Sequence, residues 1–265
     1  MTRTISPSMA GILQALELER PMLVTTEDLK RIIEVENIHT PARIVAARLR
    51  EAGWLLQTGQ RGVWEFAPAA MAGAYSSCDP LLGLRSYLAR HPNTTCGITF
   101  QTAAWVYGYS SRVPAKPEIA AQDVSISRAL PESLSASVFV PRLEYEKIKG
   151  VPVLAKESII VHMCEKPMAI RSWESAVEWL VELAADIEPE KLMAELSFRR
   201  QSTKTRTGYL LKGIRPDVAA IIYAEYKPKS KTWFGPRQKL LRHDNKWLVA
   251  DTILPFDAAR LEIAK

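Results

Sequence analysis

The sequence predicts an α+β protein made of an N-terminal winged helix-turn-helix, residues 1–75, and a larger mixed α+β domain, residues 76–265. Near the N-terminus, two helix patterns separated by a short polar connection are followed by two strand-like runs and a glycine-containing turn. Farther along, predicted strands and helices come in blocks, which favours an α+β fold over an alternating α/β fold. A length of 265 residues suits two ordinary domains.

Composition places the chain among globular proteins. The hydrophobic content is 47%, and 35 basic residues against 29 acidic ones give a net charge of +6, which is consistent with a polyanionic partner. Cys78, Cys96 and Cys164 lie far apart and without metal-ligand spacing, so reduced thiols are expected. The N-terminus lacks the apolar core of a signal peptide, and no apolar run approaches the roughly 20 residues of a membrane helix. We therefore expect a soluble, cytoplasmic protein without a membrane partner.

Two helices are predicted at the start of the N-terminal domain. Residues 8–18 place apolar side chains at helical spacing, so this segment is expected to be a supporting helix. Thr26 precedes two acidic residues, and a hydroxyl at that position can cap a short helix that runs to about residue 35. Residues 37–39 make a short connection to the next helix.

The next helix, residues 41–52, is the candidate recognition helix. Thr40 is its expected N-cap, Pro41 its first residue, and Gly53 ends it. Its inner face carries Val45, Leu49 and Ala52. Its outer face carries Arg43 and Arg50, with Arg48 beside them. A helix that is apolar inside and basic outside, preceded by another helix after a tight turn, suits the major groove of DNA.

A predicted hairpin follows this helix. The strand-like runs 54–57 and 62–66 are joined by residues 58–61, where Gln60 and Arg61 lie near the tip. Beside a recognition helix, such a hairpin is a wing that can reach phosphates or the minor groove. The alternative is a surface helix with solvated arginines, and the ordered set of elements favours DNA binding. The expected contacts with double-stranded DNA in this domain are Thr40, Arg43, Arg48, Arg50, Gln60 and Arg61.

The alanine- and glycine-rich residues 67–74 indicate a domain junction near residue 75, or equally the end of the wing followed by a short helix. Helices are expected next at 79–90 and at 99–108, where Gly108 is the stop signal. Ser172 is expected to cap a further helix, and Pro189 to open another through residue 196. The expected strands of this domain are residues 124–127, 136–140, 151–154 and 158–163.

Two basic segments lie in the second domain. Residues 199–215 contain no acid, and their cations are Arg199, Arg200, Lys204, Arg206, Lys212 and Arg215. Residues 227–247 carry seven more cations, interleaved with Trp233, Phe234 and Trp247. These segments form a solvated face, an extension of the phosphate-contacting surface, or a docking face for an acidic protein. Because a DNA-binding domain is predicted upstream, Arg199, Arg200, Lys204 and Arg206 are added to the expected DNA contacts.

Two motifs carry a resemblance to a known family. The segment AAWVYGYSSRVP, residues 103–114, is similar to a family pattern of alanines and aromatics, then HGL, then a later proline. RTGYLL, residues 206–211, is similar to the family's RLGYLL, with departures at Tyr107 and Thr207. The chain thus resembles the AbiEi family, the antitoxins of type IV toxin–antitoxin systems. The resemblance implies an autoregulating repressor that binds repeats in its own promoter and counteracts a nucleotidyltransferase-like toxin encoded beside it.

Signatures of catalysis are absent from the sequence. There is no Walker or Rossmann glycine motif, no HExxH or CxxC, and no G-x-S-x-G elbow. The histidines are scattered, and His162, in a predicted strand, is expected to be packed or hydrogen-bonded rather than a base. We therefore expect no enzyme activity, catalytic residue, metal or cofactor. The alternative is a nucleic-acid-modifying enzyme that uses the winged helix to dock on DNA.

Overall fold

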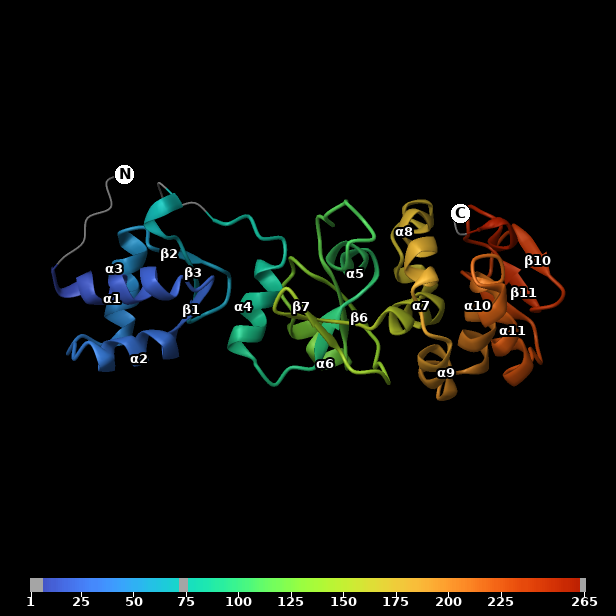
Figure 1. Cartoon of the computed structure of the whole chain (residues 1–265), viewed down its shortest axis with the longest axis horizontal. Helices are drawn as coiled ribbons and strands as arrows, with labels where there is room; N and C mark the ends of the chain where they lie inside the picture. Colours follow the sequence, from blue (N-terminus) through green and yellow to red (C-terminus); the bar gives the residue numbers. More distant parts are fainter. Residues whose placement is uncertain (1–6, 72–75, 263–265) are drawn as a thin grey trace. The chain divides into compact units, whose positions relative to one another are not determined.

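The computed structural model describes residues 7–71 and 76–262. The chain divides into two compact units, Met1–Thr94 with Ala129–Leu134, and Thr95–Arg128 with Ser135–Lys265. Both units combine helices with β-sheet, so the mixed α+β class is confirmed (Figure 1). The domain boundary expected near residue 75 falls within 72–75, outside the described residues.

The first unit packs its helices against a small antiparallel sheet. Its helices are α1 (Pro7–Glu19), α2 (Thr26–Val35), α3 (Ala42–Glu51), the short η1 (Ala69–Met71) and α4 (Leu82–Arg90). Its strands are β1 (Leu23–Thr25), β2 (Leu55–Gln57) and β3 (Val63–Phe66), in the order β1-β3-β2. Val24 pairs with Trp64, and Leu56 with Glu65. α4 contacts β1 and β3, and the apolar faces of α1, α2 and α3 join β1 and β2 in one core.

The start of α2 differs from the sequence expectation by one residue. Thr25, not Thr26, is the N-cap: its Oγ1 accepts from the Asp28 amide at 3.2 Å, and Asp28 Oδ2 accepts from the Thr25 amide at 2.8 Å. This is a capping box, which satisfies two amides that the first helical turn leaves free. Thr25 ends strand β1 in an extended conformation, so the helix begins one residue later. The Thr26 amide instead donates to Gly62 O at 2.9 Å.

The start of α3 also shifts by one residue. Pro41 is the N-cap and not the first helical residue, because its ψ of 142° is extended. No side chain caps this end, so Thr40 does not have the capping role expected of it. The Pro41 carbonyl accepts from Ile44 N at 2.9 Å and opens the helix. Gly53, with φ of 77°, follows the helix as predicted, and Ala52 is only half-buried.

The second unit is built on a mixed five-stranded sheet in the order β6-β5-β4-β8-β7. Its strands are β4 (Cys96–Ile98), β5 (Glu118–Ala121), β6 (Ser135–Val138), β7 (Glu146–Ile148) and β8 (Val151–Val153). A three-stranded sheet, β10-β11-β9, is made of β9 (Thr232–Phe234), β10 (Arg242–Asp244) and β11 (Val249–Asp251). The pairs β4/β8, β5/β6 and β9/β11 are parallel, and the others are antiparallel.

The second unit contains nine described helical elements, counting two short 3-10 helices. They are α5 (Phe100–Tyr107), α6 (Val124–Ala129), α7 (Lys156–Glu165), η2 (Pro167–Ala169), α8 (Trp173–Ala185), α9 (Pro189–Ser197), α10 (Gln201–Leu211), α11 (Pro216–Glu225) and η3 (Ala258–Arg260). Gly108, with φ of 96°, ends α5, and the Ser172 hydroxyl caps α8 by accepting from Ser175 N. Both features were predicted from the sequence.

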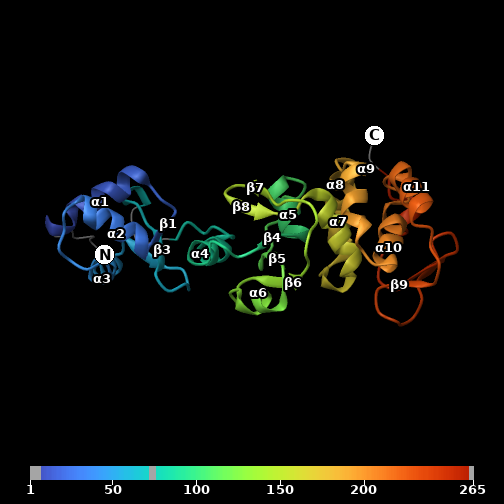
Figure 2. The ribbon, with the colours of Figure 1, turned by 90° about the horizontal axis from the view of Figure 1, so that it is seen from below.

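Two predicted strands are wrong. Residues 124–127 lie in α6, where Asp123 Oδ1 accepts from Ile126 N at 2.8 Å and favours a helical turn. Residues 158–163 lie in α7, which packs against α5, α8, α9 and α10 (Figure 2). Because α7 is buried on all sides from Glu157 to Cys164, its apolar run has no helical periodicity and imitates a buried strand.

We predict that Thr25→Ala lowers the free energy of unfolding by about 1–2 kcal/mol, because it removes the hydroxyl that caps α2. Urea unfolding followed by circular dichroism measures this loss. Thr26→Ala is the matched control, since the Thr26 hydroxyl makes only a 3.3 Å hydrogen bond with Gly62 O. A greater loss of stability for Thr26→Ala than for Thr25→Ala would contradict the assignment of the cap.

Candidate functional site

The outer face of α3 is basic. Arg43, Arg48 and Arg50 are exposed, while Val45 and Leu49 are buried in the core of the first unit. The helical repeat separates the two sets, as the sequence predicted. Within residues 7–71 and 76–262, no ion pair engages these three arginines. Their guanidinium donors are therefore free to meet an external acceptor.

The β2–β3 hairpin lies beside this face. Arg50 of α3 and residues 57–64 of the hairpin line one hollow of about 360 Å³. Arg61 is exposed and Gln60 is half-buried at the tip, and Thr40, just before α3, is half-buried too. The structure thus brings Arg50, Gln60 and Arg61 around one hollow.

A contact between the hairpin and α2 fixes the hairpin in place. Gly62 O accepts from the Thr26 amide and from the Thr26 hydroxyl. Gly62 has φ of 79°, and a Cβ at this residue would lie 2.7 Å from Thr26 Oγ1. Within the turn, Thr58 Oγ1 donates to Val63 O at 2.9 Å and accepts from Gln60 N at 3.3 Å. These contacts order the tip before any partner binds.

In the second unit, the Arg199 side chain is mostly buried and binds other residues of the same unit. Its side chain is 11% exposed and bonds to Glu195, whose side chain is 0% exposed. Arg199 Nη1 also pairs with Glu165 Oε2 at 3.1 Å, and Nη2 donates to Val140 O at 2.6 Å. The guanidinium lies over the Phe139 ring, 4.2 Å from its centroid. The Arg199 charge is therefore balanced largely by internal partners.

Arg206 and Lys204 also contact the protein itself, whereas Arg200 is exposed. Arg206 donates from Nε to Trp233 O at 2.7 Å, and burial lowers the pKa of Arg206. Lys204 Nζ donates to Ser197 O at 3.0 Å, and burial lowers the pKa of Lys204. Arg200, at the N-cap of α10, is exposed. A role in DNA contact stays a prediction for all four residues, and Arg200 has the most accessible charge.

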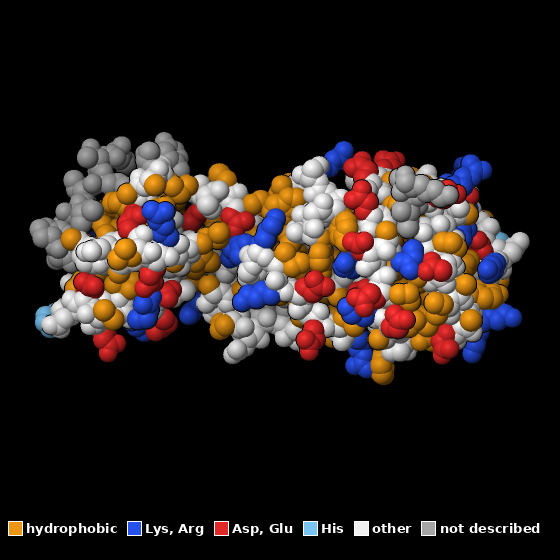
Figure 3. All heavy atoms as spheres, in the orientation of Figure 1, with side chains coloured by type: hydrophobic (Ala, Val, Ile, Leu, Met, Phe, Trp, Pro, Cys, Tyr) orange, Lys and Arg blue, Asp and Glu red, His pale blue; other side chains and the backbone are white. Residues whose placement is uncertain are grey.

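The two basic segments of the sequence meet beside the first two turns of α10. Two hollows of about 450 Å³ each share Ser202 and Arg206 in their walls. Arg200 also lines one of these hollows. Lys231 and Arg237, from the second basic segment, also line the other. This meeting could not be predicted from the sequence, because no local signal relates Arg206 to residues as distant in the chain as Lys231 and Arg237. On the face of the second unit drawn in Figure 3, basic and acidic side chains are interspersed.

His162 is a packed residue, as expected, although it lies in α7 and not in a strand. Its Nδ1 and Nε2 lie 2.9 Å from Thr99 Oγ1 and 3.0 Å from Ser137 Oγ. The ring stacks on Phe139, with centroids 4.2 Å apart. Burial lowers the pKa of His162 well below its usual value, and Arg199 adds to this shift. The imidazole is therefore neutral at physiological pH.

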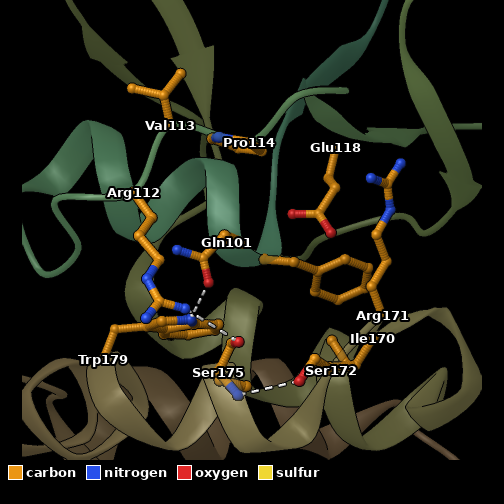
Figure 4. Close-up of a pocket in the computed structure, with 12 residues that line it drawn as sticks. Gln101, Arg112, Val113, Pro114, Glu118, Ile170, Arg171, Ser172, Ser175 and Trp179 are labelled. Carbon is orange, nitrogen blue, oxygen red and sulfur yellow. Dashed lines mark hydrogen bonds between the residues drawn. The ribbon is translucent and has the colours of Figure 1, made fainter.

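A further cavity in the second unit had no signal in the sequence. It has a volume of about 230 Å³ and lies between α5 and α8, with Glu118 and Arg171 on one side and Arg112 on the other (Figure 4). Its lining comes from segments that are distant in the chain. No spacing motif could have predicted it.

The part of the chain that the structure describes shows neither a metal-binding cluster nor a helix that could span a membrane. No group of three or more His, Cys, Asp or Glu side chains there is placed to hold a metal ion. No helix there is long and apolar enough to cross a membrane.

Part of the second unit matches a known family of protein domains. Residues 94–213 match the family model described as the AbiEi antitoxin C-terminal domain, which supports an antitoxin role in a toxin–antitoxin system. This part of the chain is an AbiEi-family antitoxin domain, so the resemblance seen in the sequence is confirmed. Such a role favours a non-enzymatic protein.

The fold as a whole is similar to a solved structure. The crystal structure of the RV2827C protein from Mycobacterium tuberculosis matches with a TM-score of 0.79 and 24% identity, over 96% of this chain and 94% of that chain. At this identity the likeness concerns the fold. No curated protein sequence matches the chain.

We predict that Arg199→Ala lowers the free energy of unfolding by about 3–5 kcal/mol, because it leaves the buried Glu195 carboxylate without its cation. The matched control is Arg200→Ala, which removes an exposed guanidinium next in sequence and changes stability by less than about 0.5 kcal/mol. Urea unfolding of both variants measures the difference. Equal stabilities of the two variants would show that the Arg199 ion pairs contribute nothing.

We predict that acid destabilises the fold in part through His162. The unfolded imidazole has a pKa near 6.5, and the folded one is lower, so below about pH 6.5 the unfolded chain binds the extra proton. The free energy of unfolding therefore falls as the pH drops through this value. Urea unfolding at about pH 7.5 and about pH 5.5 should show a smaller drop for His162→Asn than for the unchanged protein. An identical drop would contradict this contribution.

Proposed function

We propose that this protein is a DNA-binding autorepressor and an antitoxin that counteracts a nucleotidyltransferase-like toxin encoded beside it. In this proposal the first unit is a winged helix-turn-helix, with α3 in the major groove and the β2–β3 hairpin as the wing. The observation that carries the proposal is that Arg50 of α3 lines one hollow with the hairpin residues Gln60 and Arg61. The AbiEi match in the second unit supports the antitoxin half.

Different residues of the first unit would contact the bases and the backbone of the DNA. Arg43 and Arg50 lie on the exposed face of α3 and would meet base edges, since the arginine fork matches the acceptors of guanine. Arg48 and Thr40 flank that face and would contact the backbone. Arg61 would reach a phosphate or the minor groove from the hairpin, with Gln60 beside it. The DNA would be the repeats in the protein's own promoter.

The basic surface at α10 would extend this contact. Arg200 supplies an exposed charge, and Lys204 and Arg206 add positive charge beside it, whereas the charge of Arg199 is largely offset by Glu195 and Glu165. Phosphate contacts of this kind raise affinity for all sequences and make it depend on salt. They would not alter base preference, because phosphates carry no sequence information.

We predict that Arg43→Ala weakens binding to duplex DNA from upstream of its own gene by about 1–3 kcal/mol and relaxes preference at one base position. Arg61→Ala should weaken binding to all sequences alike, because a phosphate contact is lost. Gel-shift titrations at one stated salt concentration measure both effects. Arg90→Ala, exposed in the same unit but outside α3 and the hairpin, is the control. Unchanged affinity of a folded Arg43→Ala/Arg50→Ala protein would refute the recognition role of α3.

A second prediction separates the two activities in the full chain. Arg43→Ala/Arg50→Ala should release repression of a reporter driven by the protein's own promoter, because the α3 face is lost. The same variant should still protect cells that express the adjacent toxin, because residues 94–213 are unchanged. Reporter output and colony counts measure the two activities. Loss of protection by the soluble, folded variant would contradict the division between the units.

A further inference from the structure

The cavity between α5 and α8 in the second unit has apolar walls. Phe100, Ala176 and Trp179 are buried side chains that line it, and Ile170 and Pro114 extend the same surface (Figure 4). Its volume of about 230 Å³ lies below the roughly 300–1,000 Å³ of pockets for drug-sized ligands. The space therefore suits a small molecule with a single apolar group.

Gln101 keeps the aromatic wall in place. Its Oε1 accepts from Trp179 Nε1 at 2.5 Å, and its Nε2 donates to Ser110 Oγ at 2.6 Å. Both ends of the amide are thus engaged within the protein. The Trp179 ring is held at the cavity, and Gln101 does not need a ligand to satisfy its hydrogen bonds.

Glu118 places a buried carboxylate at the cavity. The residue is 6% exposed, and its Oε2 accepts from Thr102 N at 3.2 Å. Among the described residues, no ion pair within 4.0 Å joins this carboxylate to a cation. Burial raises the pKa of Glu118, and the amides at the start of α5 and the charge of Arg171 oppose this shift only in part. A buried carboxylate of this kind is stabilised by a cation brought to it.

Arg171 supplies the opposite charge next to it. Figure 4 shows the Arg171 side chain beside Glu118, on the same side of the cavity. Arg171 is exposed, and in the described part of the chain no hydrogen bond or ion pair holds its guanidinium. Arg112, on the other side, lies 3.6 Å from Glu178 Oε1 and 3.5 Å from Ser175 Oγ. The rim therefore has one guanidinium free to bind an anion.

The two signs of charge restrict the ligand. A simple anion would face the buried Glu118, and a simple cation would face Arg171 and Arg112. A molecule with an ammonium and a carboxylate attached to the same carbon atom can offer the ammonium to Glu118 and the carboxylate to Arg171 beside it. Its apolar group then removes surface from water by packing on Phe100, Ile170 and Trp179.

We infer that this cavity binds a free α-amino acid with an apolar side chain, whose ammonium group contacts Glu118 and whose carboxylate contacts Arg171. The cavity lies within residues 94–213, so binding of the amino acid does not require that the first unit bind DNA. A bound amino acid would raise the free energy of unfolding of the second unit, because a ligand that binds only the folded state stabilises that state.

Isothermal titration of the full-length protein with L-leucine and L-phenylalanine tests the site. We expect saturable binding of at least one of the two. N-acetyl-L-leucine lacks the ammonium group and L-leucinamide lacks the carboxylate, so each should bind about tenfold more weakly or worse. These comparisons use the unchanged protein and do not depend on any variant folding.

Glu118→Gln and Arg171→Gln should each weaken amino-acid binding about tenfold or more, because one charge-assisted contact is lost. Glu182→Gln and Arg128→Gln are matched controls, since both side chains are exposed and outside the cavity lining. Circular dichroism confirms that each variant is folded. Absence of saturable binding of both amino acids would overturn the inference. Equal binding of the acetylated or amidated compound would overturn it as well.

Discussion

The ion pair between Arg199 and the buried Glu195 is the interaction on which the second unit most depends. Glu195 Oε2 also accepts from Ser158 Oγ of α7 at 2.8 Å and from Arg142 N at 2.8 Å. One carboxylate thus ties α9 to α7 and to the segment after β6, and Arg199 balances its charge. Removing one partner of such a pair lowers the free energy of unfolding by more than the intact pair contributes to it, because the other charge stays buried without a partner. The outer basic surface at α10 is therefore smaller than the sequence of this segment suggests, and Arg200 is its most accessible member.

In the first unit, hydrogen bonds to the start of α2 hold the β2–β3 hairpin in a fixed position. The hydrogen bond from the Thr26 amide to Gly62 O, at 2.9 Å, fixes the hairpin to the start of α2, and the Thr26 hydroxyl adds only a longer one at 3.3 Å. Because Gly62 has a positive φ and no room for a Cβ, this geometry requires glycine. A hairpin ordered in advance loses little entropy on binding, which favours the DNA-binding role that we propose. The family match covers residues 94–213 and supports the antitoxin role independently.

Local signals predicted much of the fold, and distant partners explain what was missed. Gly53, Gly108 and Ser172 end or cap helices as expected, because these effects act within one turn. The caps of α2 and α3 shifted by one residue, since neighbouring residues compete for the same role. The strand predicted at 158–163 failed because α7 is buried on every side and shows no polar face. The pairing of Arg199 with Glu195, four residues earlier, was within reach of the sequence, but its contacts with Glu165 and Val140 were not, because those residues are remote in sequence. The Glu118 cavity was hidden for the same reason.

In the function that we propose, the first unit reads DNA through α3 and the hairpin. Hydrogen–deuterium exchange of the full-length protein, with and without duplex DNA from upstream of its own gene, tests it most directly. Measured at about 0.1 M salt, where phosphate contacts are only partly screened, the DNA should slow amide exchange in residues 40–51 and 58–62. Protection confined to residues 95–262, with α3 and the hairpin unchanged, would contradict the account.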